Sequence, residues 1–235
     1  YQDTEEVNVE DFLREGYEVE NVRVRGSEDL EEQVNAFLRG GSAYWLITEV
    51  RSKEAVKVAL SAAARRGSQP VVSSFHVRTK RQMFDLVCNM MGLHEAAYKY
   101  MDLFISTSKF ETHNGTVRRV TEISEVLKDW DDTPEYVTLF EDDRNSDILR
   151  PENLFSGESS VIGQVGSRDL SGVDVAEATD ELGLLPPEEG GSHFLFKSRE
   201  RLAVDEQDLV ESIVSEAKVK SDILNLAREE GDSKY

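Results

Sequence analysis

Short buried strands alternate with amphipathic helices along the middle of the chain, and this alternation restricts the fold more than any other feature. "AYWLITEV" (43–50) and "PVVSSF" (70–75) are apolar runs of the kind found in a sheet that is covered on both faces. "SKEAVKVALSAAARRG" (52–67) and "TKRQMFDLVCNMMG" (79–92) carry apolar residues at helical spacing. This order predicts an α/β fold with a mostly parallel sheet and flanking helices.

Each predicted helix has an apolar stripe that should face the sheet. In the first helix the stripe consists of Ala55, Val56, Ala59, Leu60 and Ala63. In the second helix it consists of Met83, Leu86, Val87 and Met90. Upstream, the alternation over Val19–Val24 predicts a further strand, and "SEDLEEQVNAFLRG" (27–40) predicts another amphipathic helix.

The pattern changes after residue 101. "DLFISTSKF" (102–110) and "VRRVTEISEV" (117–126) predict two strands, and Asn114–Gly115 between them favours a type I′ hairpin turn. Farther on, 151–172 is interpreted as loop and 184–192 as linker. One long helix is predicted over 205–231, and its apolar residues should dock on the core or on a partner. They are Leu209, Ile213, Ala217, Ile223 and Leu226.

Negative charge is concentrated in the last part of the chain. The net charge is −20, and residues 129–235 hold 27 acidic against 10 basic side chains. Such a surface repels phosphates, so we expect no binding to nucleic acid. The acidity, together with 17 arginines against 10 lysines, suits a salt-adapted protein, and an acidic interaction tail is the alternative. The single cysteine, Cys88, excludes an internal disulfide and is interpreted as a buried structural thiol.

Four motifs follow one another in order: "QDTEEV" (2–7), "WLITEVRSKEA" (45–55), "SSFHVRT" (73–79) and "RRVTEISEV" (118–126). This series resembles the secretion ATPases of type II and type IV systems, especially the archaeal branch that drives pili and archaella. In that family an acidic box, a Walker B segment, a histidine box and a hairpin follow the Walker A loop. The resemblance implies a RecA-like domain over 1–128, ending in a β-hairpin, and leaves 129–235 as an acidic extension with loops and a C-terminal helix.

The resemblance also implies roles for five side chains. Glu49 matches the Walker B glutamate, which holds the magnesium shell or orients the attacking water. Arg51 matches the family arginine, and His76 matches the histidine that senses the γ-phosphate. Asp3 and Glu6 match the acidic box. Each side chain also has a structural interpretation: an ion pair at the end of a strand for Glu49 and Arg51, a structural histidine for His76, and an acidic turn for Asp3 and Glu6.

The chain departs from the family pattern at several positions. Gln2 replaces the first glutamate of the acidic box, Thr48 replaces the glycine before the Walker B glutamate, and "RRGSQP" (65–70) replaces G-H-x-G. Glu54 matches the second Walker B acid, although a first-turn helix glutamate is the better interpretation. No G-x-x-x-x-G-K-[ST] occurs in the 235 residues. Because that loop precedes the acidic box in the family, we expect a fragment that binds ATP and Mg²⁺ poorly alone.

The sequence therefore predicts part of a motor ATPase that couples ATP hydrolysis to protein export or filament assembly. The family implies a homo-hexamer in the cytoplasm, peripheral at the inner face of the cell membrane, with a membrane platform protein as its partner. A non-catalytic regulatory or assembly subunit without the Walker A loop is the alternative, and a binding module unrelated to nucleotides is the third possibility. The spacing of His94, His113 and His193 predicts no structural metal site.

Overall fold

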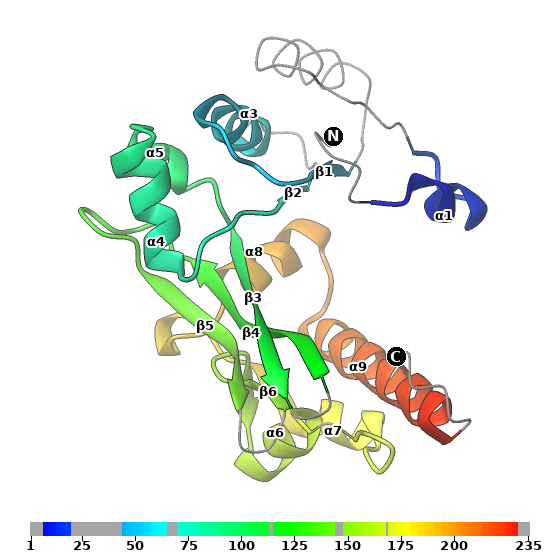
Figure 1. The fold of residues 1–235 in the computed structure, drawn as a ribbon. Helices are drawn as coiled ribbons and strands as arrows, with labels where there is room; N and C mark the ends of the chain where they lie inside the picture. The colour runs from blue at the N-terminus through cyan, green and yellow to red at the C-terminus, as the bar shows by residue number, and fades with distance from the viewer. Residues whose placement is uncertain are drawn as a thin grey trace. The chain divides into compact units, whose positions relative to one another are not determined.

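The structure is a computed structural model, and it describes residues 7–19, 44–64, 70–112, 115–143, 148–167 and 169–229 (Figure 1). Within these stretches the chain is mixed α/β, with helices and three separate sheets. The chain divides into two compact units, Tyr1–Met101 and Asp102–Tyr235. Apart from its first residue, the predicted strand at 19–24 lies outside the described residues, as does the predicted helix at 27–40.

The first unit contains a short parallel sheet and several helices. β1 pairs in parallel with β2, and Trp45 lies opposite Val71. α3, which connects the two strands, contacts β2, so that the three elements form the predicted strand–helix–strand unit. The described elements of this unit are α1 (Val9–Arg14), β1 (Trp45–Ile47), α3 (Lys53–Ala64), β2 (Val71–Ser73), α4 (Lys80–Phe84), the π-helical segment η1 (Asp85–Met90) and α5 (Glu95–Tyr98).

The helices of the first unit bury most, but not all, of the predicted stripes. Four of the five stripe residues of α3 are buried, whereas Ala63 is exposed and Ala62 is buried in its place. The second stripe fails at its end. Met83 and Val87 are buried, but Met90 is 79% exposed, so the prediction for Met90 is wrong. The physical reason is η1, because a π-helix has more residues per turn and rotates later residues away from the α-helical stripe.

The second unit is built on an antiparallel sheet in the order β3–β4–β5–β6. Its strands are β3 (Leu103–Thr112), β4 (Gly115–Val126), β5 (Tyr136–Asp143) and β6 (Ile148–Pro151). β3 and β4 form the predicted hairpin, with Thr112 opposite Gly115. Gly115 therefore begins β4 instead of occupying the predicted turn, and its φ of +117° suits glycine. The pairing of β4 with β5 joins residues on both sides of position 128, where the composition changes.

The segment 151–172, predicted to be loop, contains β7 (Phe155–Gly157) and α6 (Ser159–Val165), and the segment 184–192, predicted to be linker, contains the end of β8 (Leu182–Leu184) and the 3₁₀ turn η2 (Pro187–Glu189), so these two predictions are wrong. The other elements from residue 151 to the end are α7 (Val175–Glu181), α8 (His193–Leu202) and α9 (Glu206–Glu229). β7 pairs antiparallel with β8. Most of these elements are too short for hydrophobic periodicity to be recognised in the sequence, which explains the error.

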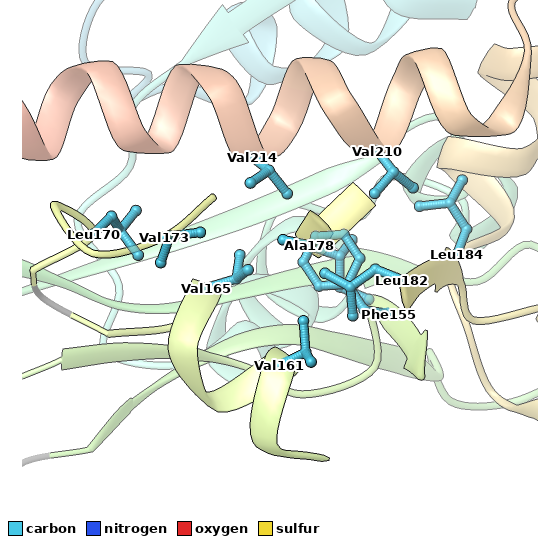
Figure 2. Packing of buried hydrophobic residues seen from close by; sticks show 11 residues of the cluster. Phe155, Val161, Val165, Leu170, Val173, Ala178, Leu182, Leu184, Val210 and Val214 are labelled. Carbon is cyan, nitrogen blue, oxygen red and sulfur yellow. The ribbon is translucent and has the colours of Figure 1, made fainter. Parts of the chain in front are cut away.

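α9 confirms the long helix predicted near the C-terminus, and it contributes to the core of its unit (Figure 2). Leu209, Ile213 and Ala217 pack against this core as predicted, whereas Leu226 is exposed. Val210 and Val214 lie deeper than Leu209, Ile213 and Ala217, and the side chain of Ile223 lies outside the described residues. The buried cluster consists of Leu154, Phe155, Val161, Val165, Leu170, Val173, Ala178, Leu182, Leu184, Val210 and Val214.

Truncating a valine in this cluster should loosen α9. We expect Val214→Ala to lower the free energy of unfolding by about 2 kcal/mol, because it removes fully buried methyl groups and leaves a cavity. Val219→Ala is the matched control: it makes the same change on the same helix, where the side chain is 56% exposed. Urea unfolding monitored by circular dichroism measures both. Equal losses in the two variants would contradict the packing of α9 on this core.

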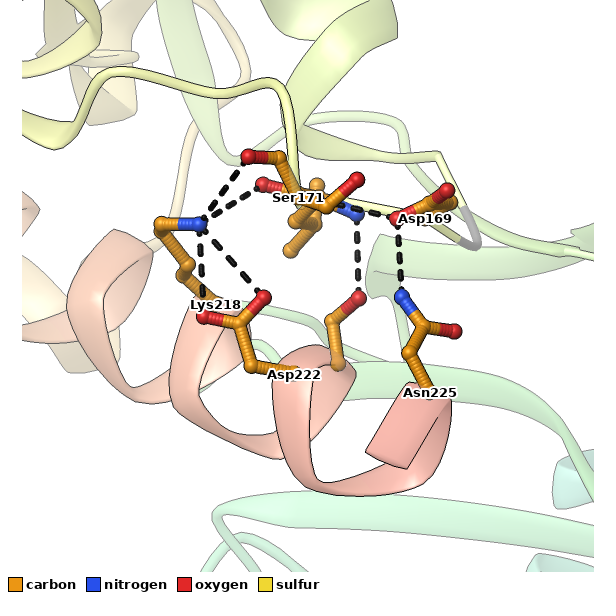
Figure 3. Close-up of polar contacts among 7 residues, drawn as sticks. Asp169, Ser171, Lys218, Asp222 and Asn225 are labelled. Atoms are coloured by element: carbon orange, nitrogen blue, oxygen red, sulfur yellow. Dashed lines mark hydrogen bonds and ion pairs between the residues drawn. The ribbon is translucent and has the colours of Figure 1, made fainter. Parts of the chain in front are cut away.

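Polar contacts also join α9 to the loop that precedes α7 (Figure 3). The Nζ of Lys218 donates to the carbonyl oxygens of Leu170, at 3.2 Å, and of Ser171, at 3.4 Å. The side chain of Asn225 donates to Asp169 at 2.9 Å. Hydrogen bonds from Ser171 and Asn225 lower the pKa of Asp169. α9 is thus held by apolar and polar contacts together. Among the described helices, α9 included, none is both long enough and apolar enough to cross a bilayer.

Candidate functional site

The backbone takes an unusual conformation two residues after β1, at the first candidate residue. Glu49 has a φ of +48°, and it is one of two described residues other than glycine with a positive φ. Such a left-handed conformation costs about 1–3 kcal/mol and persists only where the surroundings hold it. The backbone N–H of Glu49 donates to Ser74 Oγ at 2.9 Å, and the next N–H, of Val50, donates to the carbonyl oxygen of Ser74 at 2.9 Å.

Three of the residues predicted for the site come together around the carboxylate of Glu49. One oxygen, Oε2, accepts a hydrogen bond from Arg51 Nη2. The other, Oε1, lies 3.0 Å from His76 Nε2. The side chain of Glu49 is only 10% exposed, whereas those of Arg51 and His76 are 61% and 85% exposed. The carboxylate of Glu49 is therefore shielded from solvent, whereas the side chains of Arg51 and His76 are largely exposed to solvent.

The parallel pairing of β1 with β2 explains why residues 27 positions apart in the sequence meet. Glu49 follows the end of β1, and His76 follows the end of β2. Carboxyl ends of neighbouring parallel strands lie at one edge of a sheet, which is the usual ligand side of open α/β folds. The structure therefore confirms that Glu49 and His76 follow strands that end at the same edge.

Helix α3 begins immediately after this cluster. Ser52 Oγ accepts a hydrogen bond from the backbone N–H of Ala55 at 3.1 Å and so closes the first turn of α3. Glu54 lies in that turn with an exposed side chain, where a negative charge favours the helix dipole. This position agrees with the structural interpretation of Glu54. Glu49, Arg51 and the start of α3 thus lie within the six residues from Glu49 to Glu54.

Some predictions fall outside this cluster. Asp3 and Glu6, the predicted acidic box, lie outside the described residues. Cys88 is buried, as predicted. Burial, with the nearby charges of Glu95 and Asp85, raises the pKa of its thiol to about 11, which leaves little thiolate for nucleophilic chemistry at neutral pH.

Within the described stretches, no group of three or more His, Cys, Asp or Glu side chains is placed to hold a metal ion.

Ser74 was not singled out from the sequence, although it contacts the backbone of the central residue of the site. The available signal was its position two residues before His76, which places both side chains on one face of an extended segment. Comparison with known proteins adds nothing to this assignment, since no family model and no curated protein matches the chain.

Proposed function

We propose that the chain is part of a secretion-type motor ATPase, in which Glu49, Arg51 and His76 form the hydrolytic side of a nucleotide site. One observation carries this proposal: side chains from two separate motifs, the Walker B-like and the histidine-box segments, meet at one carboxylate. The proposal extends the β1–α3–β2 unit to a RecA-like, mostly parallel sheet. It also includes assembly as a homo-hexamer on a membrane platform protein, as in the family that the motifs resemble.

The chemistry of these side chains suits a nucleotide bound with Mg²⁺. Carboxylate oxygens such as those of Glu49 are preferred by Mg²⁺ and also orient water for attack on a phosphoryl group. The guanidinium of Arg51 matches the geometry of phosphate oxygens. ATP with Mg²⁺ would supply the phosphoryl group that is transferred to water. Since the 235 residues contain no G-x-x-x-x-G-K-[ST], the proposal assigns this chain the hydrolytic residues and not the phosphate cradle.

Substitution of Glu49 tests the proposal directly. Because the chain lacks the phosphate cradle, we expect the wild type to bind Mg-ATP only weakly and to hydrolyse it slowly at saturating ATP. Glu49→Gln should bind ATP as weakly as the wild type and lower kcat by about 10²–10⁴-fold. This is the range for removal of a positioned general base. Equilibrium binding of a fluorescent ATP analogue and phosphate release at saturating ATP measure the two steps. Both are compared in low and in molar salt, because the net charge of −20 makes assembly sensitive to screening.

Glu10→Gln, on the exposed face of α1, is the control for this experiment. It makes the same chemical change in the same unit, and we expect binding and kcat to stay at the wild-type values. Equal kcat values for Glu49→Gln and wild type would remove Glu49 from the catalytic step. Failure of the wild-type chain to bind ATP in both salt conditions would contradict the catalytic proposal.

One observation favours the alternative, a non-catalytic ATPase-like regulatory or assembly subunit. Both carboxylate oxygens of Glu49 are occupied by partners from the chain itself, the ion pair with Arg51 and the hydrogen bond with His76, so the cluster is complete without nucleotide. In such a subunit the three side chains stabilise the end of the parallel sheet. Its signature is a wild-type chain that binds no ATP, together with a Glu49→Ala variant that loses stability.

A further inference from the structure

The left-handed backbone conformation of Glu49 is unfavourable by itself, and a hydrogen bond to Ser74 stabilises it. Beyond the last paired residues of β1 and β2, Ile47 and Ser73, the two segments stay joined through Ser74. Its carbonyl oxygen accepts the N–H of Val50, which continues the contact between the segments. Its hydroxyl oxygen accepts a hydrogen bond from the N–H of Glu49, so this second contact is made by the side chain of Ser74 and not by its backbone. One serine thus fixes two successive N–H groups, those of Glu49 and Val50.

The same short segment also holds the side chain of Glu49. Ser74 and His76 are two residues apart in an extended stretch and are both exposed, whereas Phe75 between them is half-buried. Alternation places the side chains of Ser74 and His76 on one face. Ser74 contacts the backbone of Glu49 at 2.9 Å, and His76 contacts its carboxylate at 3.0 Å. Backbone conformation and carboxylate direction are therefore set from the same face.

We infer that Ser74 is a positioning residue for Glu49: its hydroxyl keeps Glu49 in the left-handed conformation that directs the carboxylate toward His76 and Arg51. A glutamate relaxed to an ordinary negative φ would direct its side chain elsewhere, because φ sets the direction of Cβ. As a statement about catalysis this inference rests on the proposed function. As a statement about geometry it is tested independently of any nucleotide.

Two NMR measurements on the full chain report this geometry. Backbone chemical shifts and the amide–Hα coupling of Glu49 report its φ, and the ring ¹⁵N shifts of His76 report the contact at Nε2. In the wild type we expect a positive φ at Glu49 and slow exchange of its amide proton. Ser74→Ala should lose both and shift the His76 ring signals, whereas Ser74→Thr, which keeps the hydroxyl, should retain them.

Ser73→Ala is the matched control, since it removes the neighbouring hydroxyl, one residue away on the opposite face of the segment. We expect wild-type signals from Glu49 and His76 in this variant. If the protein hydrolyses ATP, Ser74→Ala should lower kcat by about 10–100-fold, the range for partners that orient an active group. Ser74→Thr should then restore most of the rate.

The possible outcomes separate this inference from the proposed function. Unchanged Glu49 and His76 signals in Ser74→Ala would overturn the positioning role, whatever the ATPase result. A negative φ at Glu49 in the wild type would overturn it even if Ser74→Ala failed to fold. Loss of the signals in Ser74→Ala, with rescue by threonine, supports the role. If the wild type then binds no ATP, the proposed function fails while the positioning of Glu49 by Ser74 stands.

Discussion

Gly191→Ala is expected to lower the free energy of unfolding of the second unit by about 3 kcal/mol, at the upper end of what overpacking costs. A Cβ at position 191 would lie 1.7 Å from the carbonyl oxygen of Leu185 and 2.4 Å from its carbonyl carbon. These are backbone atoms of a closed turn, in which the N–H of Gly191 donates to the carbonyl oxygen of Pro186 at 2.9 Å. The turn cannot move aside without losing that bond and displacing the start of α8.

Gly163→Ala is the matched control, because a Cβ there meets no atom within 4 Å. Gly163 lies inside α6, where alanine is preferred over glycine, so we expect a gain of about 0.5–1 kcal/mol. The midpoints of urea unfolding for the two variants should therefore move in opposite directions from the wild type. A stable Gly191→Ala protein would mean that the 185–191 turn is more open than the structure has it.

Much of the fold was predictable where long segments carry a clear period. The β3–β4 hairpin and α9 were both predicted from sequence, since each extends over ten or more residues with a consistent pattern. The pairing of β7 with β8 was not predicted, because these strands have three residues each and their pairing depends on contacts distant in sequence. Met90 was wrongly predicted to be buried, because the residue types do not indicate the change from α-helical to π-helical geometry at Asp85.

The candidate site was predictable as a set of side chains but not as a geometry. Glu49, Arg51 and His76 were selected by motif and by position after strands, and these three meet in the structure. The positive φ of Glu49 could not be predicted, because glutamate rarely adopts it and no glycine marks the position. The role of Ser74 was missed for the same reason: its partner is a backbone N–H that is available only in that conformation.

Glu125→Ala is expected to lower the free energy of unfolding by about 3 kcal/mol, because two hydrogen bonds to a buried charged group are lost. Glu125 lies on β4 and is 2% exposed. Its carboxylate accepts the hydroxyl of Ser192 and the backbone N–H of Phe194, both at 2.8 Å. Ser192 in turn caps α8 by accepting the N–H of Leu195 at 3.1 Å. A negative charge at a helix N-terminus is favourable, so this one side chain fixes α8 to the sheet.

Two further variants separate the charge of Glu125 from its shape. Glu125→Gln keeps the size of the side chain but only one of the two acceptor oxygens, so one of the two hydrogen bonds can still form. We therefore expect a smaller loss of about 1–2 kcal/mol. Glu141→Ala makes the same truncation on the adjacent strand β5, where the side chain is exposed, and should change stability by no more than about 0.5 kcal/mol. Urea unfolding gives the energies, and amide exchange of Phe194 and Leu195 reports the start of α8. If Glu125→Ala left that exchange slow, α8 would be held by its apolar contacts alone, and the carboxylate would have no part in docking it.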